Sequence, residues 1–166
     1  MISQSIFSVC FKSPPKQVGG IKKPVKKACV DQADSYGMTE LMYAASLGDV
    51  KKVNDLIKAG CNVNMQDKKG STALMHAVFA GRADVVSILL DNGADPNKQD
   101  VHGDTALIYA AFFSKNEEIA QLLVMHGART DTKNNNNETA LQVAKSKGNE
   151  PLEKFLEAAQ TVKADS

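Results

Sequence analysis

Residues 70–97 read GSTALMHAVFAGRADVVSILLDNGADPN, and this stretch holds the pattern from which the fold can be predicted. Leu74, Ala77 and Val78 recur at the spacing of one face of a helix. Thr72, just before them, is a favourable N-cap because its hydroxyl can accept a backbone N–H of the first turn. The first half of the stretch therefore predicts a short helix with a narrow apolar side.

The segment from Asp84 to Asp91 predicts a second helix, after a break at Gly81. Its buried face is expected to comprise Val85, Val86, Ile88, Leu89 and Leu90. The acid at its start suits the positive end of the helix dipole, and Gly93 stands where a left-handed C-cap is expected. Residues 94–97 then form an extended turn, so the unit is two helices followed by a hairpin turn.

The same unit recurs along the chain. Thr39, Thr72, Thr105 and Thr139 are 33, 33 and 34 residues apart, and a fixed period in this range indicates stacked supersecondary units. Each unit buries its apolar face only against its neighbours, so one unit cannot fold alone. The extra residue in the third unit lies within residues 115–118, where we expect a neutral insertion in a surface loop; the alternative is a local bulge that a partner recognises.

The repeated pattern D-x-x-G-x-T-x-L-x-x-A-A-x-x-G-x-x-(D/E)-V-V-x-x-L-L-x-x-G-A-D-x-N resembles the ankyrin repeat. The resemblance implies an all-α ankyrin-repeat solenoid of helix–turn–helix–β-hairpin units with a concave groove. We expect four repeats at about 34–66, 67–99, 100–133 and 134–160, between a basic tail at 1–33 and a C-terminal tail at 161–166. The first and last units are more polar than the inner ones, which predicts an array closed at both ends.

The chain departs from the family in the Thr-Pro-Leu-His stretch that usually opens the first helix. Its four versions are Thr-Glu-Leu-Met, Thr-Ala-Leu-Met, Thr-Ala-Leu-Ile and Thr-Ala-Leu-Gln. Without proline the first helical position is less pre-organised, and without histidine a polar link is lost. We interpret this as altered stability of the same fold. His76 falls one residue later, in register with Tyr43, Tyr109 and Val143. It is either part of a polar-aromatic ladder or a packing position with a polar partner.

Charge is unevenly divided, although the formal net charge is only +1. Residues 1–30 contain six lysines and no acid, whereas the remainder carries 14 basic and 19 acidic residues. This tail is interpreted as a disordered soluble segment, with a secretory signal, a transit peptide, and a membrane-binding or nuclear lysine cluster as alternatives. The expected location is cytoplasmic, while export, organelle targeting and nuclear import stay open.

Reactive constellations are absent from the sequence. The three histidines are far apart, and Cys10, Cys29 and Cys61 have neither metal nor redox spacing, which suits a reducing compartment. There is no phosphate-binding glycine loop and no nucleophile elbow. No apolar run approaches the ~20 residues of a membrane helix. We therefore predict no enzyme activity, no catalytic residue, no cofactor and no metal site.

The resemblance implies that hairpin tips and first helices line the groove and bind a partner. Transferred position by position, the predicted partner-binding residues are Tyr36, Met38, Ser46, Leu47, Lys68, Lys69, Ser71, Phe79, Ala80, Val101, His102, Asp104, Phe112 and Phe113. Phe79, Phe112 and Phe113 are the most informative, since the family often has polar residues there. An exposed aromatic cluster is a candidate binding hot spot; the alternative is that Phe79 and Phe112 pack against adjacent helices.

The expected function is that of a non-catalytic protein–protein interaction module, a monomeric scaffold that binds a protein partner through the groove. One alternative is a stoichiometric inhibitor or immunity-type protein that caps a partner enzyme. The other is association with an anionic membrane or nucleic acid through the lysine-rich tail. We expect no small-molecule substrate, and nothing in the sequence identifies the partner.

Overall fold

The computed structural model describes residues 31–113 and 117–164. The tail predictions for residues 1–30, and Lys115 and Asn116 of the predicted insertion, lie outside the described residues. The helices of the described part are α1 (Glu40–Leu47), α2 (Val50–Lys58), α3 (Ala73–Phe79), α4 (Ala83–Asp91), α5 (Ala106–Phe113), α6 (Glu117–Met125), α7 (Ala140–Lys147) and α8 (Glu150–Ala164).

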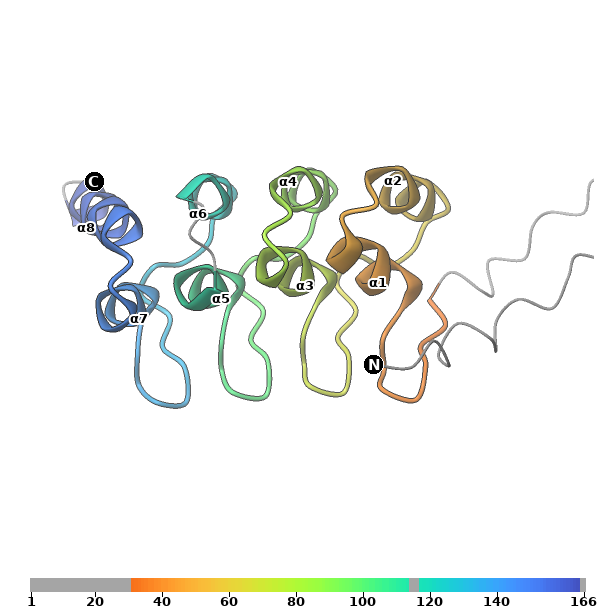
Figure 1. Cartoon of the computed structure of the whole chain (residues 1–166), viewed down its shortest axis with the longest axis horizontal. Coiled ribbons are helices and arrows are strands. Elements are labelled where there is room, and N and C mark those ends of the chain that lie inside the picture. Colours follow the sequence, from red (N-terminus) through yellow and green to blue (C-terminus); the bar gives the residue numbers. More distant parts are fainter. Residues whose placement is uncertain (1–30, 114–116, 165–166) are drawn as a thin grey trace, which may run out of the picture.

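The helices form two parallel rows, and a hairpin loop projects from each first helix (Figure 1). The inner row contains α1, α3, α5 and α7, and the outer row contains α2, α4, α6 and α8. The two helices of each unit contact each other, and equivalent helices of successive units contact one another along both rows. Within the described residues only isolated β-bridges occur, at Ala33 with Thr39 and Gln66 with Thr72. The predicted all-α solenoid is thereby confirmed.

Each inner helix begins at the predicted threonine. The N–H groups of Met42 and Met75 donate to the hydroxyls of Thr39 and Thr72, both at 3.3 Å. In return, the Thr72 N–H points at the Met75 sulfur at 3.4 Å. Met75 stands at the position where the ankyrin repeat usually has a histidine. Sulfur is a weak acceptor, so the polar link is weakened in the first two units. The fourth unit keeps it, because the Thr139 N–H donates to Gln142 Oε1 at 2.8 Å, whereas Ile108 in the third unit has no polar group to accept it.

Every hairpin is held by an acid or amide at its first position. Asp67 Oδ1 accepts the N–H groups of Lys69 at 2.8 Å and Ser71 at 2.9 Å. Asp34, Asp100 and Asn134 make the same pair of bonds in the other three hairpins. A short side-chain acceptor of this kind closes a turn locally, so each hairpin is shaped by its own residues.

Adjacent hairpins approach each other backbone to backbone. The N–H of Lys68 donates to the Tyr36 carbonyl at 3.0 Å, and that of Val101 donates to the Lys69 carbonyl at 2.9 Å. Gly70, with a φ of +76°, lies so close to the next hairpin that an added Cβ would be 2.9 Å from Asp100 Cα. Only glycine combines this left-handed geometry with such an approach.

An ion pair covers the N-terminal end face of the array. Lys52 and Glu40 meet at 2.6 Å. In the register of the repeat, Lys52 takes the place of Val85 and Ile119, both fully buried, and Glu40 takes the place of buried Ala73. Charged groups thus replace apolar ones where no described repeat packs.

The C-terminal end face has the mirror arrangement. Lys145 Nζ lies 2.8 Å from Glu157 and 3.8 Å from Glu153. The equivalents of Lys145 and Glu153 in the third unit are Ala111 and Ala120, which are buried. The predicted closure of both ends of the array therefore has a physical basis in charged side chains at core positions.

Two features of the structure lie beyond the expected bounds of the array. Asp31 Oδ1 accepts the Asn62 N–H at 2.9 Å, in the register of Asn64, whose side-chain oxygen accepts the Asp95 N–H at 2.7 Å. Residue 31 is therefore already part of the array, before the predicted start at 34. At the other end, α8 continues to Ala164, because no glycine or proline follows residue 160 to end the helix.

Candidate functional site

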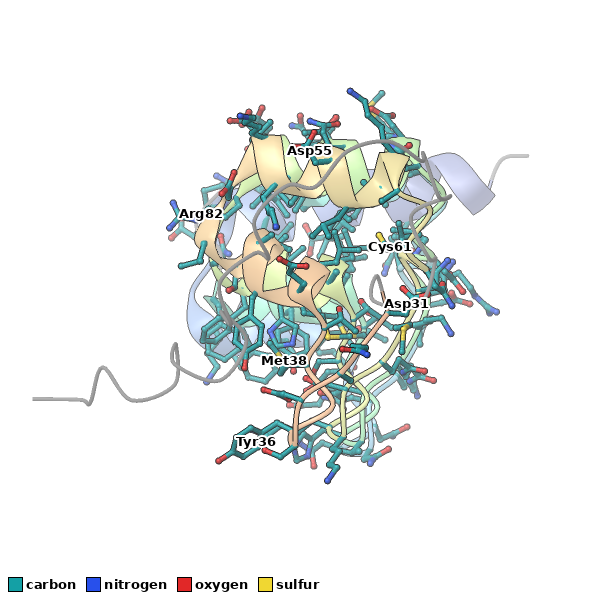
Figure 2. The ribbon with its side chains drawn as sticks, turned by 90° about the vertical axis from the view of Figure 1, so that its right-hand side faces the viewer. Asp31, Tyr36, Met38, Asp55, Cys61 and Arg82 are labelled. Atoms are coloured by element: carbon teal, nitrogen blue, oxygen red, sulfur yellow. The ribbon has the colours of Figure 1, made fainter. Side chains whose placement is uncertain are left out.

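The predicted binding residues lie in two rows, which together we name the inner face. One row consists of the hairpin tips, and the other of the C-terminal ends of α1, α3, α5 and α7. Figure 2 shows that Tyr36, at a tip, and Arg82, beyond the end of α3, lie on the same side of the array. Asp31 and Cys61 lie on the opposite side.

An aromatic cluster of Phe79, Tyr109, Phe112 and Phe113 occupies the middle of the inner face. The rings of Phe79 and Phe113 meet edge to face with their centroids 4.8 Å apart. Phe113 also lies 5.7 Å from Phe112 and 6.0 Å from Tyr109. The structure thus brings together the three phenylalanines singled out in the sequence and adds Tyr109, which was assigned only to the ladder.

The cluster crosses the boundary between the second and third repeats. Ala80 is the equivalent of Phe113 in the second unit, and its small side chain leaves room for the Phe113 ring beside Phe79. The same offset recurs at the next boundary, where Lys147 Nζ lies 5.0 Å from the centroid of the Phe112 ring. A residue at the end of one inner helix thus contacts the ring of the preceding unit.

The exposure of the rings separates the two interpretations of the phenylalanines. Phe79 is 56% exposed and Phe113 is 55% exposed, so their mutual contact leaves more than half of the surface of each residue in water. Phe112 is half-buried and packs against the core. The packing alternative therefore describes Phe112 but not Phe79.

Three of the four ladder positions bind the acid of their own hairpin, and the fourth, Val143, is a buried apolar residue. Tyr43 donates to Asp34 Oδ2 at 2.6 Å, and Tyr109 donates to Asp100 Oδ2 at 2.8 Å. His76 Nε2 lies 3.0 Å from Asp67 Oδ2. These residues are packing positions with polar partners, the second of the two interpretations, and they fasten each hairpin to its inner helix.

The two tyrosines differ in the main cause of their raised pKa. The hydrogen bond to Asp34 is the main reason why the pKa of Tyr43 rises to about 12. For Tyr109, burial comes first and the bond to Asp100 second, and its pKa also rises to about 12. Both phenols therefore stay protonated and act as hydrogen-bond donors at neutral pH.

The predicted residues differ in accessibility. Tyr36, Leu47, Lys68, Lys69, Phe79, Val101, His102 and Phe113 are exposed, and Met38, Ser46, Ala80, Asp104 and Phe112 are half-buried. Ser71 is the least accessible of the predicted residues, since it is only 5% exposed. Asp104 accepts a bond from the Asn134 amide at 2.9 Å, and burial raises the pKa of its carboxyl group.

Two cations outside the predicted set of binding residues lie on the same side of the array as the aromatic cluster. Arg82 is exposed on the turn between α3 and α4, and its stem packs so closely on Gly48 that an added Cβ would be 2.9 Å from Arg82 Cδ. Lys147 lies over Phe112. The signal available in the sequence was their position: Arg82 stands three residues after Phe79, and Lys147 is the equivalent of Phe113 in the fourth unit.

An open hollow of about 330 Å³ lies at the C-terminal side of the cluster. Its lining consists of Ala111, Phe112, Phe113, Lys147, Gly148, Asn149 and Pro151. The walls are thus mainly apolar, with one lysine on them. Such a hollow can accept an apolar side chain of a partner.

Two further observations concern the described residues as a whole. In residues 31–113 and 117–164, histidine, cysteine and acidic side chains do not gather in any group of three or more that could hold a metal ion. In the same ranges, none of the helices combines the length and the apolar character required to cross a bilayer.

The comparison with protein families gives a direct match. The family model described as "Ankyrin repeats (3 copies)" matches residues 21–100 and again residues 41–134. The two matches together span more than half of the chain. A comparison with curated proteins found no significant match. Ankyrin repeats are generally protein–protein interaction modules and are typically non-catalytic. The chain belongs to the ankyrin-repeat family.

Proposed function

We propose that the chain is a non-catalytic binding module that holds a protein partner against its inner face, in the concave groove expected of the family. The observation that carries this proposal is the aromatic cluster. Phe79 and Phe113 remain more than half exposed although they touch each other. Covering the exposed half of each ring would contribute about 1 kcal/mol, half of what full burial of such a side chain contributes.

The rigidity of the inner face supports the proposal. Gln66 Nε2 donates to the carbonyls of Gly70 at 2.6 Å and Gln99 at 3.0 Å, and Gln99 repeats this with Gly103 and Lys133. These bonds link consecutive hairpins to one another. A surface that is already ordered loses little conformational entropy when a partner binds, so more of the contact energy appears as affinity.

The experiment is affinity capture with the full chain as bait, followed by mass spectrometry. The double variant Phe79→Ser/Phe113→Ser should lose the captured partner and keep the wild-type circular dichroism spectrum. Met125→Ser is the matched control, because Met125 is 80% exposed but ends α6 in the outer row. Equal capture by wild type and the double variant would refute the proposal.

The inhibitor alternative uses the same surface and differs only in what happens to the partner. If the captured partner is an enzyme, its turnover is measured with and without an equimolar amount of the chain. Lost turnover identifies an inhibitor or immunity-type protein, and unchanged turnover a scaffold.

We propose that the chain acts as a monomer.

A second candidate function belongs to the six lysines of residues 1–30. This segment could bind an anionic membrane or a nucleic acid by charge alone. Retention of the full chain and of residues 31–166 is compared on anionic vesicles and on heparin. Equal retention would remove this candidate and would favour the proposed cytoplasmic location over a surface-bound one.

A further inference from the structure

We infer that the partner segment is acidic as well as apolar: an apolar side chain rests on Phe79 and Phe113, and carboxylates lie near Arg82 and Lys147. The inference rests on the proposed function and names the chemistry of the partner for the same inner face.

Two cations accompany the aromatic pair on this side of the array, one from the second unit and one from the fourth. Arg82 stands three residues after Phe79, and its stem is fixed against the backbone of Gly48. Its guanidinium forms no ion pair within the part of the chain that the structure describes. Lys147 lies over the Phe112 ring and contacts no carboxylate of the described residues. Among the residues that the structure describes, neither of these two cations is therefore paired with a carboxylate.

The second hairpin adds two more cations to the same face. Lys68 and Lys69 are exposed at its tip, and neither is ion-paired with a described residue. The neighbouring tips carry Tyr36 and Val101, which are 69% and 56% exposed. Lysines between exposed apolar tips repeat the combination found at the aromatic cluster.

The carboxylates of the inner face are occupied by the protein itself. Asp34, Asp67 and Asp100 each accept two backbone N–H groups with Oδ1. Their Oδ2 atoms are held by Tyr43, His76 and Tyr109. In the register of Arg82, the first unit has Asp49, whose Oδ1 caps α2 through the Lys52 N–H at 2.9 Å.

An acidic spot remains at the third and fourth hairpins. Asp104 is half-buried there, and the charge of Glu138 is among the causes that raise the pKa of its carboxyl group. A partner's carboxylates would be repelled at that spot. They are therefore expected over the second repeat and at Lys147, which sets the position of the partner along the array.

The test is a selection on the full chain from a display library of random peptides, each about a dozen residues long. The expected result is enrichment of peptides that combine Leu, Phe or Ile with Asp and Glu. A selected peptide is then synthesised, labelled and titrated by fluorescence anisotropy. Its affinity should fall about tenfold or more in Phe113→Ala, as for a hot-spot ring. Binding should weaken with ionic strength, because exposed charges are screened.

Charge reversal separates the acidic chemistry from the apolar contact. Lys147→Glu and Lys69→Glu should each lower the affinity roughly fivefold, at the upper range for an exposed ion pair. Lys58→Glu is the matched control, since Lys58 is an exposed lysine at the end of α2 in the outer row and should change nothing. Thermal melts of all variants check that the fold is retained.

Each outcome decides between the two proposals. Neutral or basic peptides that depend on Phe113 would overturn the acidic partner and leave the proposed function standing. Peptides that bind equally well to Phe113→Ala would overturn both, as would a selection without any binder. The inner face could instead retain RNA or anionic vesicles, with retention lost in Lys69→Glu but not in Phe113→Ala. That result would also overturn the inference of an acidic peptide partner.

Discussion

The clearest quantitative prediction concerns two glycines with almost the same backbone angle. Gly70 and Gly93 have φ values of +76° and +84°. Alanine in the left-handed region costs about 1–2 kcal/mol at either position. The two sites differ in space: nothing lies within 4 Å of a Cβ at Gly93, whereas a Cβ at Gly70 meets Asp100 Cα at 2.9 Å. Comparing the two alanine variants therefore isolates the contact between hairpins.

The extra cost at Gly70 has two parts. Its neighbour is backbone that cannot rotate away, so the hairpins must separate, which costs about 1–3 kcal/mol as overpacking does. Separation also strains the bond from the Val101 N–H to the Lys69 carbonyl, 2.9 Å long, a loss of about 1 kcal/mol. Gly70→Ala should therefore be about 2–4 kcal/mol more destabilising than Gly93→Ala.

The assay is urea unfolding of both variants and the wild type, followed by circular dichroism. Gly93→Ala should lower the midpoint slightly, and Gly70→Ala should lower it much further. Gly70→Ala should also lose amide protection at Val101. If the two variants unfold at the same midpoint, the left-handed angle alone explains both, and the close approach of the hairpins contributes nothing.

Three further predictions follow from buried or capping polar groups. Tyr109→Phe should lower the free energy of unfolding by about 1–3 kcal/mol, because it removes the donor to the buried Asp100 carboxylate; urea unfolding that matches the wild type would contradict this. Glu40→Ala with Lys52→Val should expose an apolar end face and produce end-to-end dimers in sedimentation, where the wild type stays monomeric. Burial raises the pKa of Asp104 above 3.8 in the folded state, so ionisation of this carboxyl group destabilises the fold. The stability contributed by its protonated form is present below pH 3.8. It is lost as the pH rises through the pKa that Asp104 has in the folded state. Relative to Asp104→Asn, the wild type should therefore gain stability as the pH falls towards 3.8, and a constant difference across an acid titration would contradict the assignment.

Local features of the fold were predictable from the sequence. Thr72 caps α3 and Gly93 has positive φ, because each depends on the preferences of one residue and its near neighbours. The period of 33 residues, read from Thr39, Thr72 and Thr105, predicted the stacking. It could do so because one unit has too little apolar surface to fold by itself.

Details of the inner face depend on how one repeat sits on the next. Ser71 was expected to contact a partner, yet it is only 5% exposed in the stacked array. The sequence singled out Phe79 and Phe113, but only the stacking offset places their rings 4.8 Å apart.

Sequence alone therefore determined the unit, its caps and its repetition, since backbone preference and the period of apolar residues are local properties of the chain. Tertiary structure decided which polar groups are already occupied, which rings stay in water and which cations are unpaired. Arg82 shows the reason: whether its charge is free depends on groups brought close by packing, such as Gly48 more than 30 residues earlier, and no local pattern records that neighbourhood.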